Sequence, residues 1–208
     1  ITEALHENKY PAGKTLHFFC SDNGGIPSLG SNGDLRAGKG TLYEGGVRVP
    51  AVMVWDGVLK PGTVVEQPLH IVDLYPTLLH LAGADDKQTK PLDGKNAWAT
   101  IAKDHPSPHE SVVLNVTPFH GAIRVGDWKL IHNGHVTANA TAVEGRETWE
   151  LFNLSDDPFE QHDLSGTEPE MLSQLKRRIA ELAQQAAAPN IPPNRPPAGF
   201  ESPAVWGN

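Results

Sequence analysis

The sequence contains a single cysteine, Cys20, among its 208 residues. One thiol excludes an internal disulfide framework and any zinc site built from several cysteines. No apolar run reaches the roughly 18 to 20 residues that a membrane-spanning helix needs. Basic residues are also scarce, because 17 Lys and Arg oppose 25 Asp and Glu and leave a formal net charge of −8. This balance disfavours a protein that binds nucleic acid through clustered cations, so any chemistry on anions requires a local basic site.

Glycine and proline are abundant, with 20 Gly and 18 Pro, yet the chain is 38% hydrophobic and 20% charged. These values indicate a loop-rich globular protein rather than a disordered one. The length is sufficient for one core with a small satellite domain. The chain begins with Ile1 rather than Met, and residues 1–5 resemble the end of a helix. We therefore expect the sequence to be part of a longer protein.

Strand, loop, strand and helix follow one another in the first half of the sequence. The apolar residues 16–20 and 51–55 each end at a turn, as buried strands do. Between them, residues 24–46 are rich in Gly, Ser and Asn and predict a long loop. Residues 73–83 predict a helix whose first residue, Asp73, caps the first turn. This order predicts an α/β layer.

The pattern changes after residues 106–108. Four short strands are predicted at residues 111–116, 121–125, 128–132 and 149–153, with a two-residue hairpin turn at Gly126 and Asp127. A capping box at residues 167–170 starts a helix that should cover this sheet. The predicted fold class is α/β, with part of a mixed-sheet domain in residues 1–110, a four-stranded antiparallel sheet with a covering helix in residues 111–188, and a Pro-rich extended tail in residues 189–208.

Asp22 and Asn23 follow the first predicted strand directly. Where the chain turns at the next two glycines, a carboxylate and an amide oxygen can converge on one ion. These oxygen donors suit a hard cation such as Ca²⁺, which takes about 6 to 8 oxygen ligands, so further ligands must come from elsewhere. The alternative interpretation is an ordinary turn.

Lys39 lies between Gly38 and Gly40, where both the backbone and the ammonium group could approach an oxyanion. A phosphate-binding loop of the nucleotide-binding type does not fit, because Gly40 replaces the required Ser or Thr and no strand leads in. The alternative interpretation is a solvated loop lysine.

Three blocks of the sequence resemble the type I sulfatases, the arylsulfatase family of the alkaline-phosphatase-like superfamily, in order and spacing. These blocks are residues 21–25 (SDNGG), 35–50 (LRAGKGTLYEGGVRVP) and 70–79 (HIVDLYPTLL). The similarity continues through residues 124–130 (RVGDWKL) and 149–158 (WELFNLSDDP). It covers most of residues 14–188, and it implies the C-terminal part of a sulfatase of the alkaline-phosphatase-like fold.

The resemblance implies that Asp22 and Asn23 are Ca²⁺ ligands and that Lys39 binds the sulfate ester and acts in catalysis. In this family the nucleophile is a formylglycine made within a Cys/Ser-x-Pro/Ala-x-Arg motif, which this sequence does not contain. Cys20 lacks the Pro and Arg of that motif and is interpreted as a buried strand thiol. The nucleophile, two further aspartate ligands and the catalytic histidines are expected on a missing N-terminal part, the implied partner of this chain.

The implied function is that of a sulfatase, a sulfuric ester hydrolase acting on sugar or aryl sulfates, with this chain inactive alone. Uncovered strands should favour self-association or a partner chain. Two alternatives stay open: a phosphomonoester or phosphonate hydrolase of the same superfamily, and a non-catalytic binding module derived from a sulfatase. The presence of Asp22, Asn23 and Lys39 together argues against the non-catalytic module.

Two further features have competing interpretations. By resemblance, His120 borders the substrate cleft and binds substrate, whereas a loop histidine by itself is more typically structural or solvent-facing. The acidic residues 156–163 do not follow the calcium-hand pattern and predict a solvated turn.

Overall fold

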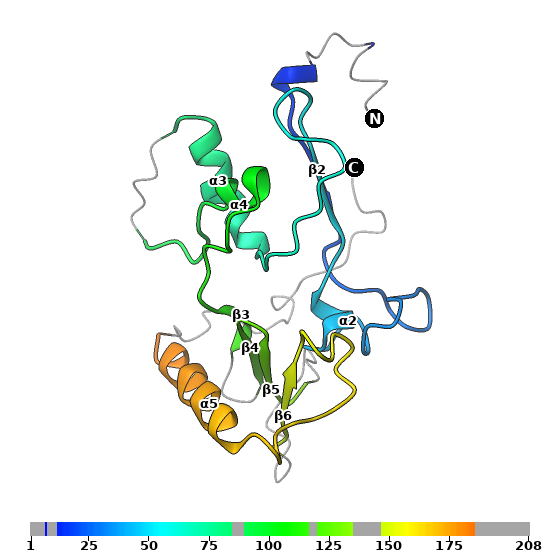
Figure 1. The fold of residues 1–208 in the computed structure, drawn as a ribbon, viewed down its shortest axis with the longest axis vertical. Coiled ribbons are helices and arrows are strands. Elements are labelled where there is room, and N and C mark those ends of the chain that lie inside the picture. Colours follow the sequence, from blue (N-terminus) through cyan, green and yellow to red (C-terminus); the bar gives the residue numbers. More distant parts are fainter. Residues whose placement is uncertain (1–6, 8–11, 85–89, 117–119, 135–146, 186–208) are drawn as a thin grey trace, which may run out of the picture.

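The computed structural model describes residue 7 and residues 12–84, 90–116, 120–134 and 147–185. Figure 1 shows two regions, one carrying strands β1 and β2 with helices α3 and α4, and the other built on the sheet of β3 to β6 beside helix α5. The predicted α/β class is confirmed. The predicted tail, residues 189–208, lies outside the described residues. In the part of the chain that the structure describes, no helix is long and apolar enough to cross a membrane.

The first region, which comes first in the sequence, contains a two-stranded antiparallel ribbon. Strand β1 (His17–Cys20) pairs with β2 (Ala51–Val54), so that the first residue of each strand lies opposite the last residue of the other. The remaining elements of this region are η1 (Ala12–Lys14), η2 (Ile71–Asp73), α3 (Leu74–Leu81) and α4 (Trp98–Lys103).

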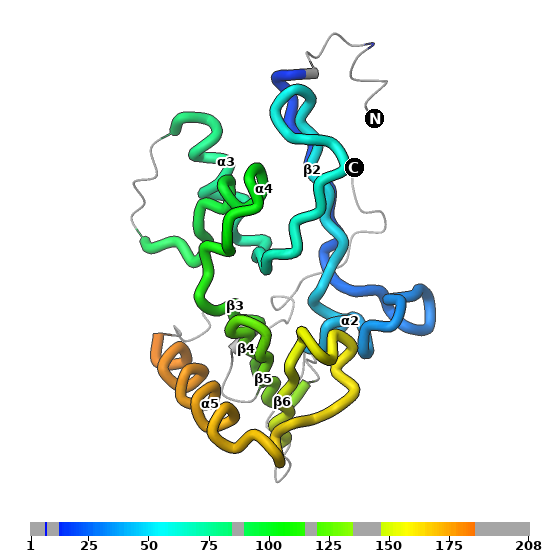
Figure 2. The backbone as a smooth tube through the Cα atoms, in the orientation of Figure 1, coloured from blue at the N-terminus to red at the C-terminus, as the bar shows by residue number. Residues whose placement is uncertain are grey.

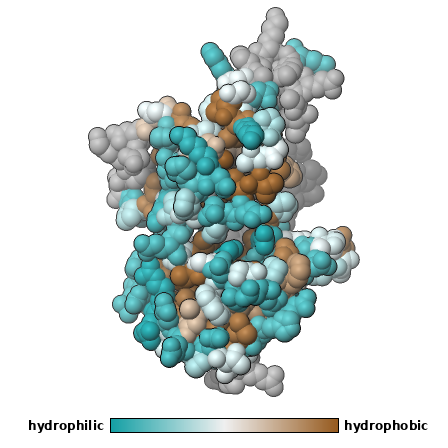
Figure 3. Space-filling model, in the orientation of Figure 1, coloured by the Kyte–Doolittle hydropathy of each residue, from teal (hydrophilic) through white to brown (hydrophobic). Residues whose placement is uncertain are grey.

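The ribbon leaves most of its apolar side chains uncovered. Phe19 is 70% exposed and Val52 56% exposed, and Cys20 is only half-buried. The prediction of a buried strand with a buried thiol is therefore wrong for this chain, because no described residues form a layer over the ribbon. Figure 3 shows apolar surface in the upper half of the molecule, where the ribbon and α3 lie.

Asp73 does not cap helix α3 in the predicted way, since its side chain makes no cap hydrogen bond to α3. The carboxylate accepts hydrogen bonds from the backbone N–H of His70 at 2.8 Å and of Lys95 at 2.9 Å. It also contacts Nε2 of His109 at 2.7 Å. Asp73 therefore joins the start of the helix to two later segments of the chain.

The second region contains the predicted four-stranded antiparallel sheet, whose strands lie in the order β3-β4-β5-β6. The strands are β3 (Val112–Val116), β4 (Gly121–Val125), β5 (Trp128–His132) and β6 (Trp149–Asn153). The predicted two-residue turn is confirmed, because Val125 pairs with Trp128 and Gly126 takes a left-handed φ of 57°. Glycine reaches this conformation at no steric cost.

Neighbouring residues on each strand face opposite sides of the sheet. One face packs Ile123, Leu130 and Leu151 against Leu175 and Ile179 of helix α5 (Pro169–Ala183). The covering helix is thus confirmed, but the predicted capping box is wrong, because the helix begins at Pro169 and its N-cap residue makes no side-chain hydrogen bond.

The other face of the sheet is covered by the long loop that joins β1 to β2. Ala122, Ile131 and Phe152 pack there against Leu42 and Tyr43. Figure 2 shows this loop descending from the ribbon to the sheet, where the short helix α2 (Glu44–Val47) lies. The loop is therefore a packed element that connects the two regions.

Candidate functional site

The predicted metal ligands lie in a tight turn after β1. Asp22 is exposed and Asn23 half-buried. Oδ1 of Asp22 accepts the backbone N–H of Asn23 at 3.0 Å, and the Asn23 amide donates to the carbonyl of Gly24 at 2.9 Å. The hydroxyl of Ser21 donates to the Asn23 carbonyl at 2.8 Å. The turn presents a carboxylate at the surface, next to a neutral amide.

Gly24 fixes this turn against helix α2. Its N–H donates to the carbonyl of Gly46 at 2.9 Å, and a Cβ added to Gly24 would lie 1.7 Å from the carbonyl oxygen of Gly45. Only glycine permits this approach. The candidate metal-binding turn is therefore placed by backbone contacts with α2.

Lys39 is exposed on the same loop. Its backbone N–H donates to the carbonyl of Gly25 at 3.1 Å, two residues beyond Asn23. The side chain of Asn32 holds this arrangement, because it accepts from Gly25 N–H at 2.7 Å and donates to the carbonyls of Gly25 and Ala37 at 3.0 and 2.9 Å. The structure thus brings the backbone of Lys39 next to the Asp22 turn.

His120 lies immediately before β4 and is 8% exposed. The next residue, Gly121, pairs with His132 of β5, so His120 lies beside the end of that strand. Burial lowers the pKa of His132; the charge of Glu147 opposes this shift, and the charges of His120 and Lys176 add to it. Its predicted role toward substrate stays a prediction.

Asp22 and Asn23 together are a small donor set for a cation. Among the described residues, no group of three or more His, Cys, Asp or Glu side chains could hold a metal ion. Asp22 and Asn23 supply oxygen donors of the type that Ca²⁺ prefers, but two donors are fewer than the about 6 to 8 that it takes. The chemistry of the pair therefore suits Ca²⁺, but two donors do not make a site.

Sequence reasoning missed a buried ionic cluster formed by Glu44, Lys129 and Glu160. Nζ of Lys129 lies 2.7 Å from Oε1 of Glu44 and 2.8 Å from Oε1 of Glu160. The predicted solvated turn at residues 156–163 is wrong at Glu160, which is fully buried. One signal was available in the sequence: Lys129 alternates with apolar residues on a strand and shares a face with Ile131.

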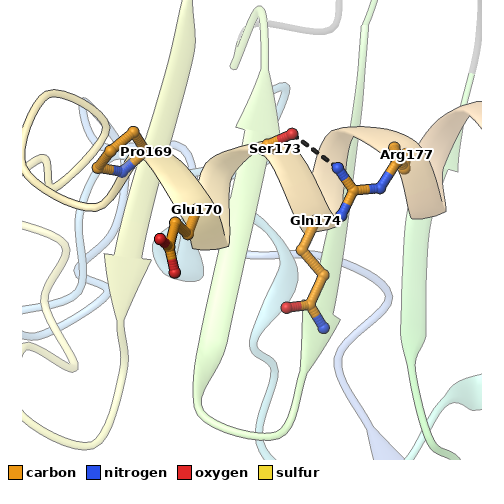
Figure 4. A pocket seen from close by; sticks show the side chains of 5 residues that line it. All are labelled: Pro169, Glu170, Ser173, Gln174 and Arg177. Atoms are coloured by element: carbon orange, nitrogen blue, oxygen red, sulfur yellow. Dashed lines mark hydrogen bonds between the residues drawn. The ribbon is translucent and has the colours of Figure 1, made fainter.

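A shallow surface depression lies along helix α5, lined by Pro169, Glu170, Ser173, Gln174 and Arg177. Figure 4 shows these side chains along one stretch of the helix, with Arg177 donating to the Ser173 hydroxyl at 2.8 Å. None of the candidate site residues lines it, so the depression is not the candidate site.

Comparison with known proteins gives consistent results. The Sulfatase family model matches residues 1–84. Arylsulfatase J of Mus musculus is 31% identical, and the match covers 93% of this chain and 39% of that protein. Arylsulfatase A of Homo sapiens is 34% identical, and the match covers 92% of this chain and 42% of that protein. The crystal structure of Ps i-CgsB is 34% identical, covers 88% of this chain and 39% of its own, and superposes with a TM-score of 0.72.

The chain thus spans about two fifths of the length of the curated relatives it matches. Its structural neighbours are sulfatases of the alkaline-phosphatase-like fold. The similarity at both the sequence and the structural level shows that the chain belongs to the sulfatase family.

Proposed function

We propose that this chain forms part of a sulfatase, a sulfuric ester hydrolase, and supplies the calcium ligands Asp22 and Asn23 and the sulfate-binding Lys39. One observation carries the proposal: a single loop, held by Gly25 and Asn32, brings the Asp22 turn next to the backbone of Lys39. The loop belongs to a chain of the sulfatase family.

Each of these side chains has a distinct task in this proposal. Asp22 and Asn23 hold Ca²⁺ from one side through their oxygen atoms, and the remaining ligands come from residues outside this chain. The bound ion supplies positive charge to the sulfate oxygens. Lys39 lies farther along the same loop and adds a positive charge, which stabilises the negative charge that develops in the transition state.

The nucleophile comes from a second part of the enzyme. This sequence contains no Cys/Ser-x-Pro/Ala-x-Arg motif in which a formylglycine could form. The ribbon β1–β2 offers that second part a docking surface, because Phe19 and Val52 are exposed and a two-stranded sheet is marginally stable by itself. We therefore propose that the rest of a sulfatase covers the ribbon and completes the site.

The substrate is a sulfate monoester carried by a sugar or an aryl group. The names of the relatives include arylsulfatases, and one structure of Ps i-CgsB is a complex with k-i-k-neocarrahexaose, whose name denotes an oligosaccharide. A panel of aryl sulfates, sulfated oligosaccharides and aryl phosphates distinguishes these classes. Turnover of the phosphates alone would overturn the assignment as a sulfatase.

Substitution of Lys39 in the complete, matured enzyme tests the role of this chain. Lys39→Ala should lower kcat/KM by about 100- to 1,000-fold, as loss of an oxyanion donor does, because the charge acts on the transition state. Lys60→Ala is the matched control, since Lys60 is also an exposed loop lysine but lies outside the candidate site. If the two variants hydrolysed the sulfate ester with the same kcat/KM, Lys39 would be a surface lysine without a catalytic role.

A further inference from the structure

The buried ionic cluster of Glu44, Lys129 and Glu160 lies where the long loop meets the sheet. The side chains of Lys129 and Glu160 are 0% exposed and that of Glu44 is 5% exposed. Besides its contact with Lys129, Glu160 accepts the backbone N–H of Glu44 through Oε2 at 2.6 Å. The cluster therefore holds both the side chain and the backbone of the first residue of α2.

The composition of the cluster is not what packing alone would favour. Two carboxylates share one ammonium group, and burial raises the pKa of Glu160 although Lys129 opposes that shift. Apolar residues of similar volume often stabilise a fold as well as a buried ion pair or better. What the ionic groups add here is a defined position, since the hydrogen bonds from Lys129 to Glu44 and from the Glu44 N–H to Glu160 are directional.

Helix α2 transmits that position to the candidate site. The carbonyl of Gly46 accepts from Gly24, the residue after Asn23, and the N–H of Gly45 donates to the carbonyl of Arg36 at 2.9 Å. A shift of Glu44 therefore moves both the turn that contains Asp22 and the segment that leads to Lys39.

A second set of contacts ties the same loop to the same part of the sheet region. The guanidinium of Arg36 pairs with Glu150 of β6 at 2.9 Å and donates to the backbone carbonyl of Glu160 at 3.0 Å. It also lies 3.9 Å above the centre of the Tyr43 ring, and the Tyr43 hydroxyl donates to Glu150. Both ends of the segment 36–44 are thus anchored on the sheet region.

We propose that Glu44, Lys129 and Glu160 are positioning residues, through which the four-stranded sheet sets the location of Lys39 and of the Asp22–Asn23 pair. The inference rests on the proposed sulfatase function for its effect on turnover. Its structural part, the dependence of the loop on the cluster, does not need that function.

The test uses Glu160→Gln in the complete enzyme. The amide of Gln has one oxygen and no charge, so it cannot both accept the Glu44 N–H and pair ionically with Lys129. We expect kcat/KM to fall about 10- to 100-fold, as for residues that orient a metal site, with the loss mainly in kcat and with weaker Ca²⁺ binding. Peptides covering residues 22–25 and 36–47 should exchange their backbone hydrogens faster than in the wild type.

Ile179→Ala is the matched control for lost stability. Ile179 belongs to α5 and is buried against the face of the sheet opposite to the one that the loop covers. It should lower the melting temperature but leave hydrogen exchange in residues 22–25 and 36–47 and the kcat of the folded enzyme unchanged. Should Glu160→Gln fold poorly, Glu44→Gln replaces it, because that variant leaves one neutralised pair of Lys129 and Glu160.

The outcomes separate the two proposals. Wild-type exchange in both peptides of Glu160→Gln or Glu44→Gln would overturn the positioning role, as would an equal acceleration in Ile179→Ala. If Lys39→Ala keeps full turnover while Glu160→Gln accelerates exchange in the loop, the positioning role stands and the proposed function of Lys39 fails.

Discussion

Substitution of Gly24 by Ala gives a sharp prediction about the candidate site, because the contact that it disturbs joins two backbones. The new Cβ would lie 1.7 Å from the carbonyl oxygen of Gly45 and 3.0 Å from Cα of Gly46. The turn and helix α2 must separate by about 1.3 Å before the shorter contact reaches 3.0 Å, the lower limit for real Cβ contacts. A displacement of about 1 Å in a catalytic constellation costs on the order of 100-fold in rate.

We therefore expect Gly24→Ala to lower kcat/KM of the complete enzyme about 100-fold and to weaken Ca²⁺ binding, measured by aryl sulfate hydrolysis and by calcium titration. Gly30→Ala is the control on the same loop, because its Cβ would meet only a carbonyl oxygen at 4.0 Å. It should behave like the wild type in both assays. If Gly24→Ala kept turnover within twofold of the wild type, the Asp22 turn would not be set by its contact with α2.

Three further predictions concern metal binding, packing and pH. The double variant Asp22→Ala/Asn23→Ala should abolish tight Ca²⁺ binding of the complete enzyme, and an unchanged calcium titration would contradict the ligand assignment. In this chain alone, Phe152→Ala should lower the free energy of unfolding in urea by about 3–5 kcal/mol, because Phe152 is fully buried. Phe19 is exposed, so Phe19→Ala should change that free energy by no more than about 0.5 kcal/mol. Burial lowers the pKa of His132 in the folded state, so the unfolded state takes up a proton first as the pH falls below about 6.5. The free energy of unfolding should therefore decline below that pH, and it should decline less in His132→Gln.

Local patterns in the sequence were enough to predict most of the sheet region. Strands β4 and β5 and their turn follow from apolar alternation around Gly126, because both signals act between residues close in the chain. The covering helix follows from its apolar face, although its first turn lacks the predicted capping box. The ribbon differs, because whether a strand is buried depends on neighbours that its own residues do not specify, and Phe19 stays exposed here.

The candidate site likewise has a part that local sequence patterns can indicate and a part that depends on contacts between distant residues. The Asp22 turn and the glycines beside Lys39 are local features, and the sequence alone is enough to propose them as candidates. The contacts that place this loop join residues 85 to 124 positions apart in the sequence: Lys129 with Glu44, Glu160 with Glu44, and Arg36 with Glu150 and Glu160. No spacing rule applies at such separations, and an acidic segment that lacks a calcium pattern is read as solvated unless its partner is known.

The same contacts explain why the sheet region bears on a site to which its strands contribute no proposed metal ligand. A glycine-rich loop has many accessible conformations, and fixing it costs conformational entropy at every residue. The loop offsets part of this cost by burying Leu42 and Tyr43 against Phe152, and it gains a defined position from Lys129. If the sheet region were separated from residues 12–84, the loop would lose both contributions, and only its internal contacts, such as those of Asn32, would hold Asp22 and Lys39 in place. The sheet region is therefore part of the candidate site in energetic terms.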